Sequence, residues 1–310
     1  MKILITGGAG FIGSQVADRY IADEHQVVVV DNLSTGKRAH INPRAVFYQM
    51  DIRDPQMKTI IARERPSVIN HHAAQLDVRK SVEDPLLDAG TNILGMLNLL
   101  EGAVGQGVQK FIFASSGGAI YGEQPPASPP AREDTPMHPL SPYGVAKAAG
   151  ELYLHTYEAV HGLPSVALRY SNVFGPRQDP YGEAGVVAIF VGKLLTEGQL
   201  LINGDGLQTR DYVFVDDVVE ANALALRANV SGPFNIGTGV EKTVNELFSL
   251  LLKITGKSAP EIHGPAKSGE QRRSVLDNSK AKDRLGWEPR VSFEEGLRRT
   301  VQYFAQKPQP

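Results

Sequence analysis

The feature that most constrains the fold is a glycine-rich turn between two short apolar runs. Residues 3–5 read Ile-Leu-Ile, glycines follow at positions 7, 10 and 13, and an apolar-periodic stretch extends from Ile12 to Tyr20. A second apolar run, residues 27–30, ends on Asp31, which lies 18 residues after the last glycine. This order predicts a strand, a tight turn, a helix and a second parallel strand, the βαβ unit that binds dinucleotides.

The residue types of this unit suit a cofactor that carries a pyrophosphate. Glycines let the backbone turn tightly and approach the phosphates, and the helix N-terminus offers free N–H groups and the positive end of its dipole. Asp31 can accept hydrogen bonds from both ribose hydroxyls and would repel a 2′-phosphate, which favours NAD over NADP. Lys37 and Arg38 weaken that preference slightly. A glycine-rich turn without a ligand is the disfavoured alternative. The motif follows a strand and opens a helix, and the next strand ends on an acidic residue, Asp31.

Length and composition indicate a globular enzyme of two domains or of one large α/β unit. The chain has 310 residues, of which 42% are hydrophobic and 21% charged, too apolar a composition for disorder. The net charge of −2 gives no reason to expect nucleic acid or an anionic membrane as a partner. No cysteine is present, which excludes disulfides and thiolate chemistry, and no apolar stretch approaches the ~20 residues of a membrane span. We therefore expect a cytoplasmic protein without a metal site.

The first half of the chain alternates short apolar strands with helical patterns. Strands are expected at 45–49, 68–70, 110–114 and 165–171, and helices at 55–65, 90–104 and 144–161. This alternation predicts an α/β fold with a doubly wound parallel sheet of the Rossmann type. Residues 174–212 look irregular. Further strands are expected at 212–215 and 233–237, and helices at 218–228, 243–255 and 293–305.

These patterns predict two regions. The NAD-binding Rossmann domain is expected to comprise 1–173 plus 213–238, and a smaller C-terminal α/β substrate-binding region 174–212 plus 239–310. The proline-rich residues 125–142 are predicted to form a long surface loop. Helices 90–104 and 144–161 carry more apolar residues than one packing face needs, so they are either buried core helices or the interface of a homodimer. We expect the homodimer.

Tyr143 and Lys147 form the candidate catalytic pair. They lie four residues apart in Ser-Pro-Tyr-Gly-Val-Ala-Lys, so a helix places both on one face. A free tyrosine titrates near pH ~10, and an ammonium group one turn away favours its phenolate. Such a tyrosine can take a proton from a substrate hydroxyl while hydride leaves the same carbon. A surface Tyr-x-x-x-Lys pair is the alternative, and the upstream dinucleotide motif argues against it.

These motifs carry a resemblance to a known family. Thr-Gly-Gly-Ala-Gly-Phe-Ile-Gly at 6–13 and the segment 141–147 resemble the extended short-chain dehydrogenase/reductase family, and within it the UDP-glucose 4-epimerase group. The resemblance covers nearly the whole chain. It implies that tightly held NAD transiently oxidises C4 of a UDP-hexose, that the 4-keto sugar turns over in the pocket, and that the reaction has no net redox change.

The resemblance also implies the cofactor contacts. Asp51 and Ile52 fall where the family holds adenine, residues 73–75 fall at the nicotinamide end, and Asn92 matches an asparagine that fixes the loop over the cofactor. The full implied set is Gly7, Gly10, Phe11, Ile12, Gly13, Asp31, Asn32, Ser34, Gly36, Asp51, Ile52, Ala73, Ala74, Gln75, Asn92, Tyr143, Lys147 and Tyr170.

The substrate contacts are implied in the same way. Asn172 and Arg210 match the family's diphosphate-binding residues, although Arg210 could instead pair with Asp211 or Asp217. Lys267 and Glu270 fall where the family usually has Arg-Pro-Gly-Asp. The implied set is Asp77, Gly117, Gly118, Asn172, Arg210, Lys267, Glu270 and Arg272, with Arg273 an alternative to Arg272 for the phosphate charge.

Two positions depart from the family pattern. The third catalytic residue is usually a Ser or Thr four positions before the tyrosine of a Val-Tyr-Gly element, and that position is Gly117 here. Ser116, a water molecule or Tyr143 acting alone are the alternatives, and Ser116 is our candidate. Ser274 stands where some members carry a bulky residue, and its small size resembles the arrangement that admits N-acetyl groups.

Other activities are weighed against this one. A nucleotide-sugar 4,6-dehydratase needs an Asp-Glu pair where this chain has Gly118-Ala119, and a reductase would consume cofactor. A catalytically silent NAD-binding regulator is supported only by Gly117.

Three further features have structural explanations. His71 and His72 are expected to be packing or backbone-bonded residues. Asp216 and Asp217 are expected to have an N-cap and first-turn role in the helix at 218–228, and Trp287 to anchor the C-terminal segment.

Overall fold

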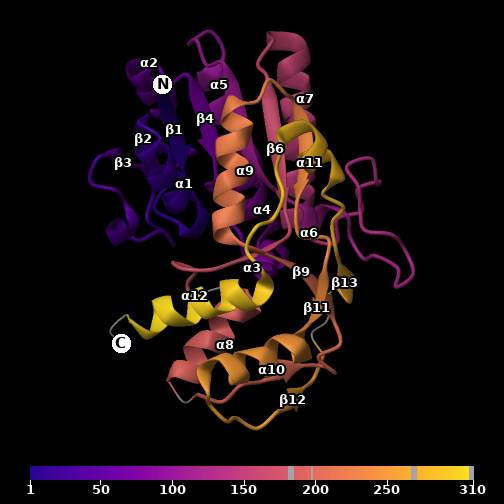
Figure 1. Cartoon of the computed structure of the whole chain (residues 1–310). Coiled ribbons are helices and arrows are strands. Elements are labelled where there is room, and N and C mark those ends of the chain that lie inside the picture. Colours follow the sequence, from indigo (N-terminus) through magenta and orange to yellow (C-terminus); the bar gives the residue numbers. More distant parts are fainter. Residues whose placement is uncertain (181–184, 197, 267–270, 307–310) are drawn as a thin grey trace.

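The computed structural model describes residues 1–180, 185–196, 198–266 and 271–306. Its centre is a seven-stranded sheet in the order β10-β6-β5-β4-β1-β2-β3, and every pair in it is parallel (Figure 1). The strands are β1 (Lys2–Thr6), β2 (Gln26–Asp31), β3 (Val46–Gln49), β4 (Val68–His71), β5 (Lys110–Ser116), β6 (Ser165–Tyr170) and β10 (Gly232–Ile236). The predicted doubly wound parallel sheet is confirmed.

Helices cover both faces of this sheet because its strands alternate apolar side chains between two cores. Leu4, Phe111 and Phe113 pack with α2 (Met57–Glu64), α5 (Gly95–Ala103) and α7 (Pro142–His161). Ile3, Ile5 and Ile112 point to the other face, which α1 (Phe11–Ala22) and α9 (Val215–Arg227) cover. Strands buried on both faces read as continuous apolar runs, which is why sequence patterns located them.

The segment predicted as one helix at 90–104 is interrupted. It follows α3 (Val78–Glu83) and α4 (Pro85–Ala89), passes through the π-helical stretch η2 (Gly90–Leu94), and continues as α5. A short helix α6 (Gly117–Ile120) follows β5, and a 3-10 turn η1 (Arg38–His40) precedes β3. The proline-rich residues 125–142 form a loop up to the start of α7, as predicted.

Most of the remaining elements gather below the carboxyl edge of the large sheet, whereas α11 (Ser279–Leu285) lies beside the sheet (Figure 1). The elements below the edge are β7 (Asn172–Phe174), α8 (Val186–Leu195), β8 (Ile202–Asn203), β9 (Thr209–Phe214), β11 (Glu241–Thr243), α10 (Val244–Thr255), β12 (His263–Gly264), β13 (Arg273–Ser274) and α12 (Phe293–Ala305). α11 contacts β10, whereas α8, α10 and α12 pack on one another.

Several sequence expectations for this region are wrong. Residues 174–212 are not irregular, because they contain α8 and most of β9. The strand expected at 212–215 begins at Thr209, and α11 had no sequence prediction. Helix α9 begins at Val215 with Phe214 as its N-cap, so the expected N-cap role of Asp216 and Asp217 is wrong, whereas their expected place in the first turn is confirmed. The side chain of Asp217 accepts hydrogen bonds from Arg290 N and Val291 N.

Trp287 anchors the C-terminal segment as expected. Its side chain is 1% exposed, and its indole Nε1 donates to Asp217 O at 2.8 Å.

Candidate active site

The candidate site lies at the carboxyl ends of β1, β4, β5 and β6. Thr6, His71, Ser116 and Tyr170 end these four strands, and the registers pair Thr6 with His71 and Ser116 with Tyr170. In an open parallel sheet, ligands bind in the crevice at this edge, next to the point where the strand order reverses. The candidate residues from both halves of the chain therefore converge where chemistry is expected.

The glycine-rich turn has the shape of a phosphate cradle. A Cβ on Gly7 would lie 2.6 Å from Ala73 N, and one on Gly13 would lie 2.4 Å from Gly7 O. Gly7 also has a φ of +70°, which favours glycine. A Cβ on Gly10, in contrast, would meet only Gly7 O within 4 Å, at 3.2 Å. Gly10 thus faces open space at the N-terminus of α1, as close approach of a pyrophosphate requires. The candidate residues Phe11 and Ile12 open that helix, and both are half-buried.

Asp31 closes the other side of this cradle. One of its carboxylate oxygens accepts a hydrogen bond from Ala9 N at 3.0 Å, and the other accepts one from Leu33 N at 2.8 Å. A Cβ on Gly36 would lie 2.8 Å from this carboxylate, so glycine allows the loop to pass over it. These backbone contacts fix Asp31 with acceptor capacity remaining for ribose hydroxyls.

Asp51 lies beside this loop. It pairs with Arg53 at 2.8 Å and accepts a hydrogen bond from Asn32 Nδ2 at 2.9 Å, and these partners hold the pKa of its carboxyl well below the ordinary value. Ser34 N donates to Asn32 Oδ1, and Ile52 is buried against Gly95. The residues expected around adenine therefore form one connected group.

The loop after β4 is held from two sides. Ala73 N donates to Thr6 Oγ1 at 3.3 Å, and the missing Cβ of Gly7 lets Ala73, which precedes Ala74, approach the glycine turn. Asn92 accepts a hydrogen bond from Gln75 N at 2.8 Å and donates to Gln75 O at 2.9 Å. Asn92 is buried in η2, so the π-helical turn aims its amide at the loop.

Tyr143 and Lys147 lie on the first turns of α7. Ser141 caps this helix by accepting a hydrogen bond from Gly144 N, and Pro142 occupies its first position. Lys147 Nζ lies 5.6 Å from the centroid of the Tyr143 ring and donates to Ala114 O at 2.8 Å. The predicted arrangement of the pair on one helical face is confirmed.

The electrostatics of the pair follow from burial and from neighbouring groups. Burial raises the pKa of Tyr143 to about 12, whereas a hydrogen bond with the Ser116 side chain lowers it. Burial lowers the pKa of Lys147 to about 8, and the carboxylates of Asp88 and Glu151 act in the opposite direction. Ser116 therefore lies beside the tyrosine without any backbone shift.

His71, His72 and Tyr170 lie at the carboxyl ends of β4 and β6 and pack beside the site. His71 stacks on Phe113 with ring centroids 5.7 Å apart and shares a 2.7 Å hydrogen bond with Thr6 Oγ1. His72 stacks on Tyr170, whose hydroxyl accepts a hydrogen bond from Asn222 Nδ2 at 2.8 Å. Both histidines are packing residues, as expected. The polar partner of the His71 ring is the Thr6 side chain, whereas His72 Nε2 is buried without a hydrogen-bond partner among the described residues and His72 N donates to Thr6 O at 3.0 Å. No group of His, Cys, Asp or Glu residues within the described ranges is arranged to hold a metal ion.

The space beside Gly118 is bordered by polar atoms from three separate segments. A Cβ on Gly118 would lie 3.8 Å from Asn172 Oδ1, 3.8 Å from Ser274 Oγ and 4.0 Å from Ser116 Oγ. Gly117 differs, because a Cβ there would lie 2.6 Å from Leu276 Cδ1. A side chain at 117 would therefore require the Leu276 side chain to move, whereas Ser116 Oγ borders the space beside Gly118.

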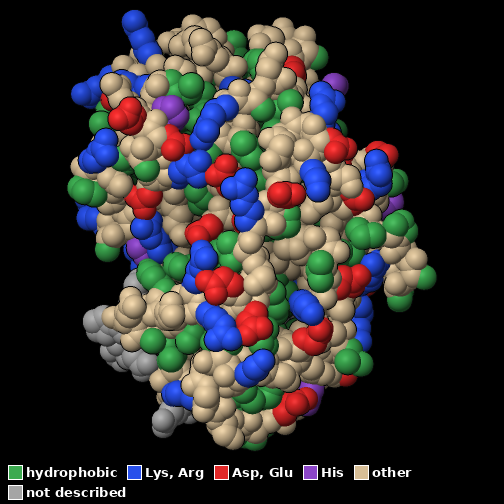
Figure 2. All heavy atoms as spheres, viewed as in Figure 1, with side chains coloured by type: hydrophobic (Ala, Val, Ile, Leu, Met, Phe, Trp, Pro, Cys, Tyr) green, Lys and Arg blue, Asp and Glu red, His purple; other side chains and the backbone are tan. Residues whose placement is uncertain are grey.

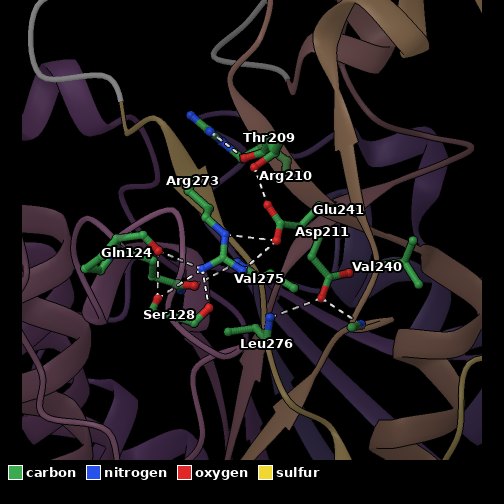
Figure 3. A network of polar contacts seen from close by, with 12 residues as sticks. Gln124, Ser128, Thr209, Arg210, Asp211, Val240, Glu241, Arg273, Val275 and Leu276 are labelled. Atoms are coloured by element: carbon green, nitrogen blue, oxygen red, sulfur yellow. Dashed lines mark hydrogen bonds and ion pairs between the residues drawn. The ribbon is translucent and has the colours of Figure 1, made fainter.

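Three arginines from this half of the molecule have different surroundings, and Figure 3 shows two of them, Arg210 and Arg273. Arg273 binds Glu241 at 2.6 Å and donates to Ser128 O of the proline-rich loop, so its guanidinium is engaged in this network. Arg272 forms an ion pair with Asp205 at 2.8 Å. Arg210 points away from the Arg273 network and donates to Thr209 O.

The proposed alternative partners of Arg210 are occupied. Asp211 accepts hydrogen bonds from Thr238 and Gly239, and Asp217 accepts them from Arg290 and Val291. Asp77 caps α3 through Arg79 N and Lys80 N. Lys267 and Glu270 lie outside the described residues.

Sequence reasoning missed two residues next to the site, Leu276 and Asp88. Leu276 gave no signal, because its contact with Gly117 joins distant parts of the chain. Asp88 gave a weak one, since it stands four residues before Asn92, which is the spacing of one helical face.

Charged residues of both signs are mixed on the visible surface (Figure 2). Figure 2 shows Lys, Arg, Asp and Glu intermixed over the visible face, in keeping with the small net charge. Among the described residues, no helix combines the length and apolarity needed to cross a membrane.

Comparison with known proteins agrees with this geometry. Residues 3–237 match the model of the NAD dependent epimerase/dehydratase family. The chain is 46% identical over 316 residues to a UDP-glucose 4-epimerase of Mycolicibacterium smegmatis, covering 100% of both chains. A crystal structure of a Thermotoga maritima UDP-glucose 4-epimerase with UDP-glucose is 52% identical, covers 98% of both chains and has a TM-score of 0.96. A Thermus thermophilus UDP-glucose 4-epimerase in complex with NAD is 46% identical, covers 99% of both chains and has a TM-score of 0.94. The chain belongs to the NAD dependent epimerase/dehydratase family.

Proposed function

We propose that the chain is a UDP-glucose 4-epimerase that interconverts the C4 epimers of a UDP-hexose with bound NAD. The observation that carries this proposal is the joint position of Tyr143, Lys147 and Ser116 at the sheet edge where the glycine cradle ends. The same edge borders the Gly118 space, which Asn172 and Ser274 enter from the other half of the molecule.

The cofactor would be held by the chain's own cradle. Gly10 leaves space for the pyrophosphate at the α1 N-terminus, Asp31 accepts from the ribose, and Asp51 with Ile52 borders the adenine. When bound, NAD supplies the position that takes and returns the hydride of C4.

Tyr143 is the proposed acid/base. Its phenolate oxygen removes the proton of the C4 hydroxyl, and the same oxygen returns a proton to the ketone oxygen in the reverse step. Lys147 opposes the effect of burial on the tyrosine, because its ammonium group stabilises the phenolate electrostatically. The Ser116 hydroxyl donates to the sugar oxygen or to Tyr143 and keeps the two groups aligned.

The C4 position can be epimerised only if the ketone turns over between the two transfers. The Gly118 space is bordered by small or short polar side chains, which leaves the sugar room to rotate. Ser274 is 2% exposed and small, and this supports UDP-N-acetylhexosamines as additional substrates. Arg210 and Asn172 are the proposed diphosphate contacts, because a guanidinium fork matches phosphate geometry.

We further propose a homodimer through α7 and the α4–η2 segment. Exposed apolar side chains line these neighbouring elements: Leu152 is 65% exposed, Val160 67%, Leu94 62% and Leu86 84%. Large apolar side chains this exposed on neighbouring elements suit a self-complementary interface, because a partner copy would remove them from water. The cytoplasmic location expected from the sequence stays a prediction.

The decisive experiment is proton NMR of the purified protein with UDP-galactose and, separately, with UDP-N-acetylgalactosamine, without added cofactor. Appearance of the gluco epimer supports epimerisation with tightly held NAD, and the relative rates test the Ser274 argument. No new sugar signal from either substrate, while NAD co-purifies, would contradict the proposal. A dehydratase would form a 6-deoxy-4-keto sugar in the same spectra. A reductase would leave these samples unchanged and would consume NADH stoichiometrically only in a separate sample to which NADH is added.

A further inference from the structure

The proposed chemistry leaves one buried carboxylate beside the catalytic pair unused. Asp88 is 1% exposed and lies on α4, which packs against α7. A carboxylate is rarely buried unless it is paired, because burial removes its hydration. The question is what Asp88 contributes at this place.

One oxygen of Asp88 organises the loop after β4. Asp88 Oδ1 accepts hydrogen bonds from Gln75 Nε2 and Asn92 Nδ2, each at 2.9 Å. Asn92 in turn binds the backbone N–H and C=O of Gln75, and Gln75 Oε1 accepts from Asp77 N at 2.7 Å. Asp88 is therefore the shared acceptor of the two amides that fix this loop.

The other oxygen of Asp88 remains without a hydrogen-bond partner among the described residues, although it is buried. The nearby cation is Lys147, which is 4% exposed on the adjoining helix. In a poorly solvated interior, opposite charges interact over longer distances than in water. The Asp88 carboxylate raises the pKa of Lys147 and also that of Tyr143.

The other titratable groups around Lys147 act differently. Glu151, on α7 itself, also raises the pKa of Lys147, but it is committed to Arg169 in an ion pair of 2.6 Å. His71 and His72 face Lys147 from β4 and its loop, and burial keeps their pKa values low, so both are neutral. The charged residues of α3, which packs on α4 and α7, are exposed to solvent.

We propose that Asp88 is a positioning residue of the epimerase: its Oδ1 fixes the loop at the nicotinamide end, and its second oxygen places a buried negative charge at the packing contact between α4 and the helix that carries Lys147. This inference rests on the proposed function. The charge of Asp88 acts on Tyr143 and Lys147, and the Oδ1 atom of Asp88 acts on the loop, so the two roles can be separated by substitution.

The direction of the effect follows from the sign of the charge. Asp88→Asn keeps an acceptor for Gln75 and Asn92 but removes the negative charge. Both Lys147 and Tyr143 should then titrate at lower pH, so both limbs of the kcat–pH profile shift to lower pH by roughly 0.5–1 unit, the scale of one nearby charge in a protein interior. KM for the UDP-sugar should remain unchanged, since Asp88 does not border the Gly118 space.

The test has a readout that does not depend on turnover. The Cε resonance of Lys147 is assigned by its loss in Lys147→Met and titrated by NMR in the NAD-loaded protein, in the wild type and in Asp88→Asn. A lower pKa of Lys147 in Asp88→Asn supports the inference even if the protein epimerises another sugar. Failure of the wild type to epimerise UDP-galactose would count against the proposed function alone.

Glu83→Gln is the matched control, since it removes one exposed carboxylate from the neighbouring helix α3. It should leave the Lys147 titration and the pH profile unchanged. Asp88→Ser also removes the charge and introduces a smaller side chain. The Lys147 titration is measured in this variant if Asp88→Asn fails to fold. An unchanged Lys147 pKa in a folded Asp88 variant, or loss of the fold in both variants, would overturn the proposal.

Discussion

Leu276 occupies the space into which a side chain at position 117 would extend, since a Cβ on Gly117 would lie 2.6 Å from Leu276 Cδ1. A side chain at 117 would require Leu276 to move, and the neighbouring hydroxyl is that of Ser116, the proposed third catalytic residue. The start of α6 and the segment that follows β13 therefore constrain each other, although 159 residues separate them along the chain.

We predict that Gly117→Ser destabilises the protein and does not increase activity. The added Cβ and hydroxyl overpack a fully buried contact, which typically costs about 1–3 kcal/mol. Thermal unfolding of the variant checks this. Gly117→Ser combined with Leu276→Ala should be more stable than the sum of the two single substitutions predicts, and additive effects would contradict the steric argument.

Tyr143→Phe should abolish epimerisation while leaving NAD and UDP-sugar binding intact. Loss of a positioned acid/base typically lowers the rate by about 10²–10⁴-fold. Steady-state kinetics with UDP-galactose and calorimetric titration with UDP measure the two properties. Tyr153→Phe, at an exposed position on the same helix, is the control and should retain full activity. Substantial turnover by Tyr143→Phe would exclude the proposed mechanism.

Two glycine substitutions in the same turn should have different effects, one on stability and the other on NAD binding. Gly13→Ala places a Cβ 2.4 Å from Gly7 O, so the turn must move and the melting temperature should fall. Gly10→Ala meets only one atom at 3.2 Å, so the fold should tolerate it, but the methyl group enters the phosphate space and NAD should be lost. Melting temperature and the NAD released on denaturation test this. A Gly10→Ala protein that retains NAD would contradict the proposal that the pyrophosphate lies against Gly10.

Stability should fall as the pH decreases below about 6.5, in part because of His72. Burial lowers the pKa of His72 to about 3 in the folded protein, whereas an unfolded histidine titrates near ~6.5. Between these values the unfolded state binds the additional proton, so acid favours unfolding with a slope of up to about 1.4 kcal/mol per pH unit. Urea unfolding at several pH values measures the slope. His72→Phe keeps the ring on Tyr170 and should reduce it; an unchanged slope would assign the acid sensitivity to other groups.

The proposed homodimer predicts that Leu152→Glu yields monomers. The new charges would be brought together across a two-fold interface, where unpaired buried charge is costly. Light scattering of the wild type and the variant distinguishes the two states. Leu207→Glu, at a similarly exposed leucine outside α7, is the control and should leave the oligomeric state unchanged.

The parts of the fold that sequence patterns predicted are those that depend on local spacing. The glycine turn, the buried strands and the i,i+4 placement of Tyr143 and Lys147 are set within a few residues. Helix α8 was missed because its run of apolar residues has no polar face, so it lacks the 3.6-residue period that identifies a surface helix. Its helical form depends on packing against α10 and α12.

The remainder of the site depends on contacts between distant segments. Thr209, Arg210 and Asp211 carry no strand pattern, and they become strand because β11 and β13 pair with them on either side. The commitment of Arg273 to Glu241 and the proline-rich loop is equally non-local. The family resemblance suggested a phosphate-binding role for Arg273, but it could not show that the carboxylate of Glu241 lies beside this residue.

Strand β10 completes the large sheet from residues 232–236, long after the chain has left it at β6. A nascent chain that ends before this strand exposes the whole hydrogen-bonding edge of β6, and such an edge is a template for aggregation. The large sheet therefore cannot be completed during synthesis until the chain has been made through residue 236, after α8 and β9. Any fragment designed to bind NAD alone must carry β10 with it, either as a linked strand or as an added peptide.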